Sequence, residues 1–172
     1  MLQQNSFSKQ ELDSMFNVLN PPDMQLPSEP MRMIDRVTEV SADGGKMGRG
    51  RLHAEFDIHP DLWFFGCHFR GDPVMPGCLG LDALWQSLGF FLAWAGHEGK
   101  GRALGVGEVK FFGEVLPGCQ VVSYQIDIKR ILIKDIVVGI ADGGVAVDGK
   151  PIYSAKNLRV GLIPLNQPGA LS

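Results

Sequence analysis

The stretch GCLGLDALWQSLGFFLAWAG, residues 77–96, is the most apolar part of the chain and decides the fold. Its apolar residues occupy every face of a helix, which is typical of a helix enclosed by protein or by lipid. We expect a helix from Gly77 to Gly96, and about 18 residues at 1.5 Å each span roughly 27 Å, the width of a small domain. Asp82 and Gln86 interrupt the stretch. An ionisable group in lipid costs about 2.5 kcal/mol or more, so we expect a buried helix and no membrane span.

The segments around this helix favour β-strands. Before it, Ser8 to Glu11 matches a capping box and predicts an N-terminal helix from Lys9 to Val18. Strands are expected at Met31–Val40, Gly48–Ile58, Ala103–Leu116, Gln120–Ile131 and Leu132–Ala141, and in a last hairpin of Val145–Val147 and Pro151–Ile163 around Asp148-Gly149. One long helix and about six strands predict an α+β domain with an antiparallel sheet wrapped around the helix. One sheet rarely covers a helix completely, so we expect a second copy of the chain to help.

The composition is that of an ordinary globular protein, with 172 residues, 45% hydrophobic and 20% charged. We expect a single domain over residues 1–172, in which residues 1–30 are an N-terminal helix and linker and residues 31–172 are the core. A net charge of −3 argues against a nucleic-acid binder. The three cysteines form no CxxC pair, and no secretory signal is apparent, which favours reduced thiols and a cytoplasmic location.

Two titratable residues stand out near the start of the apolar helix. Asp82 lies about one turn into it among large apolar neighbours, where an unpaired carboxylate would be costly to bury. It is therefore either paired or protonated, and both states suit a catalytic acid. His68 lies in a loop rich in glycine and proline that leads into the helix, and it is a candidate base. Gly77, at the helix start, allows a carbonyl oxygen to approach the free backbone N–H groups there.

Other chemistries fit less well. Cys67 and Cys78 lie near this region as conceivable nucleophiles, but free cysteine is usually a small buried hydrophobe. His53, His59, Cys67 and His68 lack the spacing of a metal site, so we expect no metal and no cofactor. A base, an acid and a polarised carbonyl suit proton abstraction beside a carbonyl with loss of a β-hydroxyl.

Three long segments carry a resemblance to a known family. They are PDLWFFGCHFRGDPVMPGCLGLDALWQ (60–86), GKGRALGVGEVKFFGEVLP (99–117) and, more weakly, IADGGVAVDGKPIYSAKNLRVGL (140–162). The chain resembles the 3-hydroxydecanoyl-[acyl-carrier-protein] dehydratase/isomerases of bacterial type II fatty acid synthesis. The resemblance implies a hotdog fold and a homodimer whose active sites pair His68 of one subunit with Asp82 of the other. It implies dehydration of 3-hydroxyacyl thioesters and isomerisation of the trans-2 to the cis-3 enoyl product.

The resemblance also implies an acyl chain carried by the phosphopantetheine of acyl carrier protein into a narrow apolar tunnel. Related dehydratases without isomerase activity carry Glu at the position of Asp82, so this residue favours the bifunctional branch. Aromatic candidates for the tunnel wall are Phe64, Phe65, Trp85 and Phe111. Basic candidates for a patch that meets the acidic carrier protein are Lys129, Arg130, Lys134, Lys156 and Arg159.

Two alternatives remain open at the level of sequence. An acyl thioesterase on the same fold also needs a carboxylate near a helix terminus, and fold does not fix function. A non-catalytic acyl-binding module would bind the thioester unchanged, and it would need neither His68 nor Asp82.

Overall fold

The apolar stretch forms one continuous helix, α2 (Gly77–Trp94), in the computed structural model, which describes residues 4–15 and 26–164. The helix ends because Gly96 adopts a left-handed conformation with φ of 92°. The N–H of Gly96 donates to the Ala93 carbonyl at 2.9 Å, and the N–H of His97 donates to the Leu92 carbonyl at 3.1 Å. These two bonds satisfy carbonyls that the helix end leaves free.

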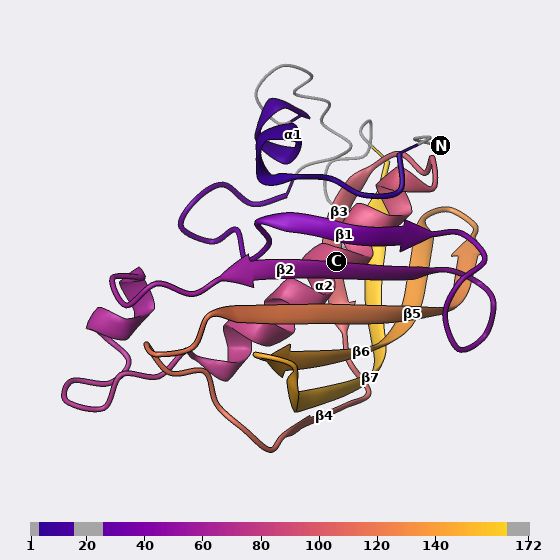
Figure 1. Cartoon of the computed structure of the whole chain (residues 1–172). Coiled ribbons are helices and arrows are strands. Elements are labelled where there is room, and N and C mark those ends of the chain that lie inside the picture. The colour runs from indigo at the N-terminus through magenta and orange to yellow at the C-terminus, as the bar shows by residue number, and fades with distance from the viewer. Residues whose placement is uncertain (1–3, 16–25, 165–172) are drawn as a thin grey trace.

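The described part of the chain forms a seven-stranded antiparallel sheet that curves around α2 (Figure 1). The strands are β1 (Arg36–Ser41), β2 (Arg51–Asp57), β3 (Lys100–Gly105), β4 (Glu108–Phe111), β5 (Val121–Ile133), β6 (Val137–Val147) and β7 (Lys150–Ile163). Their order is β1-β2-β5-β6-β7-β3, and β4 also pairs with β7. The helix lies against β2, β5, β6, β7 and β3, so one sheet covers several of its faces. The predicted α+β class with an antiparallel sheet around a long helix is confirmed.

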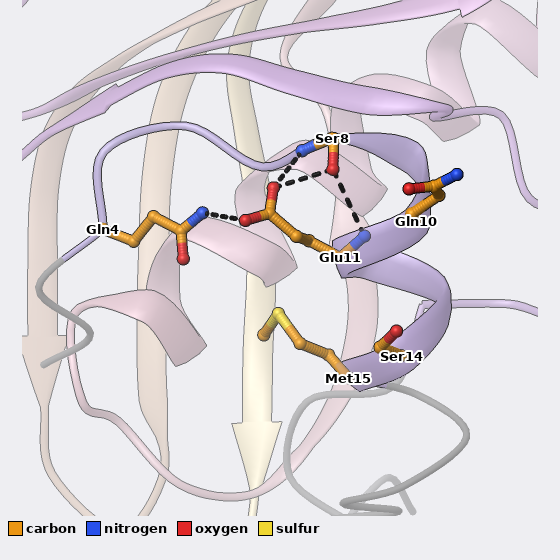
Figure 2. A pocket seen from close by; sticks show the side chains of 6 residues that line it. All are labelled: Gln4, Ser8, Gln10, Glu11, Ser14 and Met15. Carbon is orange, nitrogen blue, oxygen red and sulfur yellow. Dashed lines mark hydrogen bonds between the residues drawn. The ribbon is translucent and has the colours of Figure 1, made fainter.

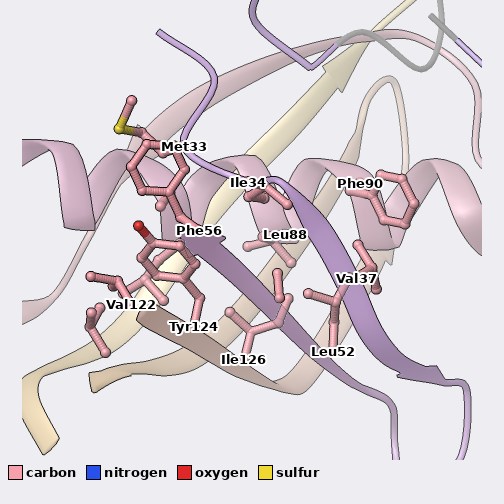
Figure 3. Close-up of a cluster of buried hydrophobic side chains, with 14 of the residues drawn as sticks. Met33, Ile34, Val37, Leu52, Phe56, Leu88, Phe90, Val122, Tyr124 and Ile126 are labelled. Atoms are coloured by element: carbon pink, nitrogen blue, oxygen red, sulfur yellow. The ribbon is translucent and has the colours of Figure 1, made fainter. Parts of the chain in front are cut away.

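The core lies between the concave face of the sheet and α2. Figure 3 shows Leu88 of α2 among apolar side chains of β1, β2 and β5. Fully burying one such Leu, Ile or Phe side chain contributes about 1.5–3 kcal/mol. Tyr124 of β5 is the largest fully buried side chain, and its hydroxyl has no hydrogen-bond partner among the described residues.

Several strand boundaries differ from the prediction, and the separately predicted strand Val145–Val147 is the end of β6. β1 begins at Arg36 and not at Met31, because the backbones of Met31 and Met33 bond to a side chain of α2 and not to a strand. The predicted strand Ala103–Leu116 is two strands, β3 and β4, which both pair with β7. A turn divides the predicted strand Leu132–Ala141, where Lys134 N–H donates to the Ile136 carbonyl at 3.2 Å. The turn falls at Lys134 and Asp135, the two charged residues in a stretch rich in Ile and Val.

The N-terminal capping box is confirmed at helix α1 (Lys9–Ser14). The hydroxyl of Ser8 accepts from Glu11 N–H at 3.3 Å, and the Glu11 carboxylate accepts from Ser8 N–H at 2.8 Å (Figure 2). The predicted end of this helix at Val18 lies outside the described residues. A short 3-10 helix, η2 (Trp63–Gly66), precedes the loop that carries His68. No helix in the described ranges is long and apolar enough to cross a membrane.

Candidate active site

The loop after η2 holds His68 through its backbone and its ring. The N–H of His68 donates to the Phe64 carbonyl, and the His68 carbonyl accepts from Val74 N–H, both at 2.8 Å. The ring Nδ1 lies 3.0 Å from the Val74 carbonyl oxygen. A carbonyl only accepts, so Nδ1 carries the hydrogen, and in the neutral ring Nε2 keeps a free lone pair. The loop thus leaves Nε2 of His68 able to accept a proton.

Gln86, one turn further along α2, holds the carboxyl of Asp82. Its amide Nε2 donates to Asp82 Oδ2 at 2.7 Å and to the Met31 carbonyl at 2.9 Å. Its Oε1 accepts from Met33 N–H at 3.1 Å, which fixes the orientation of the amide. Asp82 Oδ1 is left for other partners. An acid at this place would therefore carry its proton on Oδ1, because Oδ2 already accepts from an amide.

Gly77 lies at the first turn of α2. Pro76 precedes it without a side-chain cap, and the fully described first turn of the helix contains no acidic residue. Leu79 N–H donates to the Pro76 carbonyl at 3.0 Å, whereas the N–H groups of Gly77 and Cys78 precede the first bond of the helix and can meet an oxygen that gains negative charge. A Cβ on Gly77 would lie 3.0 Å from Cε1 of Phe111, so the ring of Phe111 covers the glycine. The space beside Gly77 is therefore narrow, although Phe111 is exposed and able to shift.

Within one chain, the described residues show no polar contact between the side chains of His68 and Asp82. No hydrogen bond in these ranges links His68 with Asp82: the imidazole bonds to Val74, and the carboxyl bonds to Gln86. Along α2, however, the sheet leaves a partly exposed stripe that consists of Cys78, Leu81, Asp82, Trp85, Gly89 and Ala93. Asp82 therefore lies on the face of the helix that its own sheet does not cover.

A comparison with protein families decides the relationship. The model of the FabA-like domain matches residues 26–156, which is more than half of the chain. The chain belongs to the FabA-like domain family. The curved sheet around one long helix is accordingly a hotdog fold.

Solved structures with low sequence identity share this fold. The dehydratase heterocomplex ApeI:P from Xenorhabdus doucetiae matches with a TM-score of 0.63 at 17% identity, over 86% of this chain and 91% of that chain. A candidate thioesterase, a phenylacetic acid degradation-related protein from Ralstonia eutropha JMP134, matches with a TM-score of 0.52 at 13% identity, over 74% of this chain and 83% of that chain. Identities this low show the fold alone.

The tunnel candidates of this FabA-like chain have different surroundings. Phe64 and Phe65 are buried and pack edge to face with ring centroids 4.6 Å apart. The indole of Trp85 donates to the Gly105 carbonyl at 3.2 Å. Phe111 is 52% exposed and lies 4.7 Å from the ring of Tyr153, next to Gly77. Among the four, Phe111 thus lies beside the start of α2, and their role in a tunnel stays a prediction.

The basic candidates for the carrier-protein patch differ in their exposure and in their ion pairs. Lys129 bonds to Asp142 at 3.2 Å and to Asn157 at 2.8 Å, and Lys156 lies 3.5 Å from Glu108. Arg130, Lys134 and Arg159 are exposed. Arg130 and Arg159 both pair in register with Ile140 of β6, so they lie two strands apart on the outer face of the sheet. These three residues are the exposed candidates without an ion pair among the described residues, whereas Lys156, whose side chain is 63% exposed, faces Glu108.

Sequence reasoning missed the role of Gln86. The available signal was a polar residue four positions after Asp82 in an otherwise apolar helix, since residues at this spacing meet on a helix surface. A separate surface hollow beside α1 contains none of the candidate residues (Figure 2). The described ranges also contain no group of three or more His, Cys, Asp or Glu side chains placed to hold a metal ion.

Proposed function

We propose that the chain dehydrates 3-hydroxyacyl thioesters on acyl carrier protein and isomerises the trans-2-decenoyl product to cis-3-decenoyl. Membership of the FabA-like family supports a hotdog dehydratase in general. The observation that carries the proposal is the tautomer of His68, whose Nδ1 faces the Val74 carbonyl and leaves Nε2 as a base. A non-catalytic binding module would have no need of such an arrangement.

The dehydration step balances with these groups alone. The thioester carbonyl accepts from the N–H groups at Gly77, which makes the proton on the α-carbon more acidic. His68 Nε2 removes that proton, and the electron pair of the broken C–H bond forms the C2–C3 double bond. The C3–O bond breaks, and the hydroxyl leaves as water with the proton of Asp82. Exchange of protons with solvent then restores the neutral imidazole and the protonated carboxyl.

The isomerisation uses the same two groups. His68 removes a proton from C4 of the trans-2 enoyl thioester, the double bond moves to C3–C4, and C2 receives a proton. Asp82 in place of Glu, by resemblance, favours this second activity. Asp82 Oδ1 is the atom that we assign to the proton donor, because Oδ2 accepts from Gln86.

We propose that two copies of the chain form each site, with His68 from one and Asp82 from the other. Two observations support this arrangement. Asp82 lies on the stripe of α2 that its own sheet leaves partly exposed, and in the described chain His68 and Asp82 bond to different partners. The exposed Arg130, Lys134 and Arg159 are the proposed contact for an acidic carrier protein.

Incubation with a 3-hydroxydecanoyl thioester tests the activity. We expect trans-2 and cis-3 enoyl products by chromatography, and a loss of about 10³-fold or more in kcat for Asp82→Asn and His68→Ala. Near-wild-type turnover in either variant would refute the assignment. Release of free thiol without an enoyl product would instead identify a thioesterase, the alternative that the shared fold leaves open.

A further inference from the structure

The segment from Ser28 to Asp35, between α1 and β1, controls the residue that holds Asp82. Its backbone contributes two of the three hydrogen bonds of Gln86: the Met31 carbonyl accepts at 2.9 Å, and Met33 N–H donates at 3.1 Å. The remaining amide hydrogen of Gln86 goes to Asp82 at 2.7 Å. The direction of the Asp82 carboxyl therefore depends on where the backbone of residues 31–33 lies.

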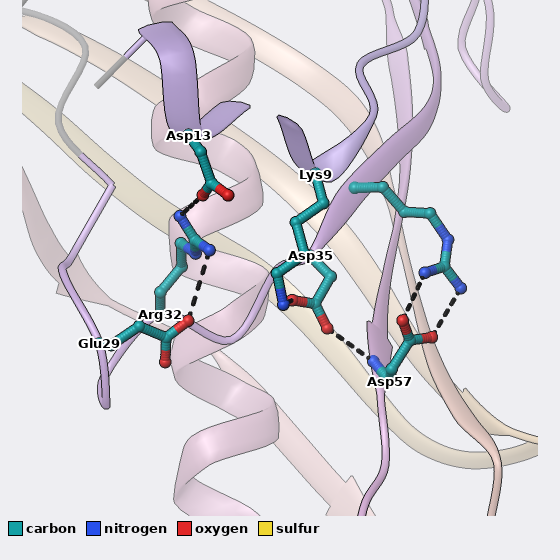
Figure 4. A network of polar contacts seen from close by, with 7 residues as sticks. Lys9, Asp13, Glu29, Arg32, Asp35 and Asp57 are labelled. Carbon is teal, nitrogen blue, oxygen red and sulfur yellow. Dashed lines mark hydrogen bonds and ion pairs between the residues drawn. The ribbon is translucent and has the colours of Figure 1, made fainter. Parts of the chain in front are cut away.

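Arg32 lies between those two backbone contacts and fixes them to α1. Its Nη1 donates to Asp13 of α1 at 2.6 Å, and its Nη2 lies 3.4 Å from Glu29. Figure 4 shows the guanidinium between these two carboxylates, in front of α2. The side chain of Arg32 is only 11% exposed, so water screens these ion pairs less than those at an open surface.

The rest of the segment is held at separate points. Met31 N–H and Arg32 N–H both donate to the Ser28 carbonyl, at 3.0 and 3.2 Å, and the indole of Trp63 donates to the Pro30 carbonyl at 3.1 Å. A second ion pair, Lys9 with Asp35 at 2.6 Å, joins α1 to the start of β1. The hydrogen bond to Asp35 raises the pKa of Lys9, which agrees with a docked α1.

We propose that Arg32 is a positioning residue for Asp82, with Asp13 of α1 as its anchor. The chain of contacts runs from Asp13 through Arg32 to the backbone of residues 31–33, then through Gln86 to the carboxyl of Asp82. Loss of the guanidinium frees this backbone, Gln86 loses two fixed partners, and the carboxyl spends less time in its reactive orientation. The catalytic part of this inference rests on the proposed function, whereas the structural coupling does not.

Hydrogen exchange tests the coupling without any assay of activity. Arg32→Leu should raise the exchange rate of the Met33 amide by about tenfold, because that amide donates to Gln86. Arg51→Leu is the control: Arg51 pairs with the carboxylate of Glu39, away from Gln86, and the Nε of both arginines is buried without a partner among the described residues. An unchanged exchange rate at Met33 in Arg32→Leu overturns the coupling.

A double-mutant cycle tests the catalytic consequence. Arg32→Leu and Asp13→Asn should each lower kcat about tenfold with KM changed less than about twofold, because a small misplacement of a catalytic group is costly. Arg32→Lys should recover most of the loss, since it retains a charge for Asp13. In a Gln86→Met background, Arg32→Leu should have no further effect on kcat.

The outcomes separate this inference from the proposed function. If Arg32→Leu lowers kcat in the Gln86→Met background by the same factor as in the wild type, the positioning role is overturned, because Arg32 would then act by a route that does not include Gln86. A wild-type protein without dehydratase activity overturns the proposed function, while exchange at Met33 still decides the coupling. The exchange measurement uses only the Arg32 and Arg51 variants, so it holds even if Gln86→Met does not fold.

Discussion

At the scale of single residues, the site depends on hydrogen bonds that leave one reactive atom free on each side chain. Nδ1 of His68 faces the Val74 carbonyl and frees Nε2, and Oδ2 of Asp82 faces Gln86 and frees Oδ1. Neither bond brings in a second charge. Neutral partners therefore orient both side chains, and in the proposed mechanism the substrate meets the two remaining atoms.

Gly77→Ala tests access to the start of α2. The new methyl group would narrow the approach to the N–H groups that we propose for the thioester carbonyl, so we expect kcat/KM to fall by about 100-fold. The free energy of unfolding should change by less than about 1 kcal/mol, because Phe111, the nearest side chain, is exposed and free to shift. Steady-state kinetics and denaturant unfolding measure the two effects.

The double variant Gly77→Ala/Phe111→Leu is the control. Leucine removes the ring that contacts the new methyl group at 3.0 Å, yet the methyl group still obstructs the carbonyl. Activity should therefore remain low. Full recovery in the double variant would assign the loss to the contact with Phe111 and not to blocked access.

Tyr124→Phe tests the buried hydroxyl in the core. Burial raises the pKa of Tyr124 and keeps its hydroxyl neutral, and the hydroxyl has no partner among the described residues. Removing an unsatisfied buried hydroxyl should increase the free energy of unfolding by about 1 kcal/mol, or a melting temperature by about 2–4 °C. A decrease of similar size in calorimetry would contradict this interpretation and indicate a hydrogen bond that the hydroxyl makes in solution.

The sequence singles out three candidates whose roles stay predictions, His68, Asp82 and Gly77: a histidine in a glycine-rich loop, a charge in an apolar helix and a glycine at a helix start. It was uninformative about the residues that position them. Gln86 meets Met33 and Met31 across separations of 53 and 55 residues, and only the folded chain brings them together. The same holds for Arg32 and Asp13, which are 19 residues apart.

At the scale of elements, α2 was predictable and the strand boundaries were less so. A long, mostly apolar run that ends at Gly96 permits few other structures. Side-chain to backbone bonds displaced the start of β1, and the β5–β6 turn begins at Lys134, directly after Ile133, which ends β5 although its side chain is 68% exposed. The signal for this turn was the charged pair Lys134-Asp135 within a stretch rich in Ile and Val.

Gly89→Arg tests the exposed stripe of α2. Nothing lies within 4 Å of a Cβ built at Gly89, so arginine fits within one copy of the chain. In a dimer that covers this stripe, an unpaired charge would be desolvated at a cost of several kcal/mol. We expect the dimer Kd to rise by at least about tenfold in sedimentation equilibrium. Gly118→Arg, in an exposed turn with similar space, is the control, and an unchanged Kd for Gly89→Arg would place the interface elsewhere.

Asp57→Asn tests the ion pair that joins β1 to β2. Arg36 donates to both carboxylate oxygens of Asp57 at 2.8 Å, and this hydrogen bonding lowers the pKa of Asp57 below its ordinary value of 3.8. A lowered pKa stabilises the fold above that ordinary value, and the contribution is lost as the pH falls through the lowered pKa. The wild type should therefore lose more stability below about pH 4 than Asp57→Asn does.

Denaturant unfolding between about pH 2 and pH 7 measures this difference. Asp61→Asn is the matched control, because Asp61 is exposed in the loop after β2 and has no ion pair among the described residues. Parallel stability curves for the wild type and Asp57→Asn would show that the Arg36 pair contributes little to acid unfolding.

At the scale of the whole molecule, the two edges of the sheet differ in how far other parts of the chain cover them. Residues before α1 cover the edge at β1: Phe7 and Val37 exchange hydrogen bonds at 2.7 and 2.9 Å, and Asn5 accepts from Val40 at 2.8 Å. At the other edge, Lys100 to Leu104 of β3 are exposed. An open edge and a partly exposed face of α2 on the same chain agree with the dimer that the proposed function requires.

Mixed dimers of inactive subunits test the shared site most directly. His68→Ala and Asp82→Asn subunits with different tags are co-expressed, the mixed dimer is purified, and dehydration of a 3-hydroxydecanoyl thioester is measured. One of its two sites would combine an intact His68 with an intact Asp82, so we predict roughly half of the wild-type rate per dimer. A dimer of the double variant with a wild-type subunit should be inactive. The account would be contradicted if the dimer of His68→Ala and Asp82→Asn subunits were inactive and the dimer of double-variant and wild-type subunits had half of the wild-type rate. That result would place each site within one chain.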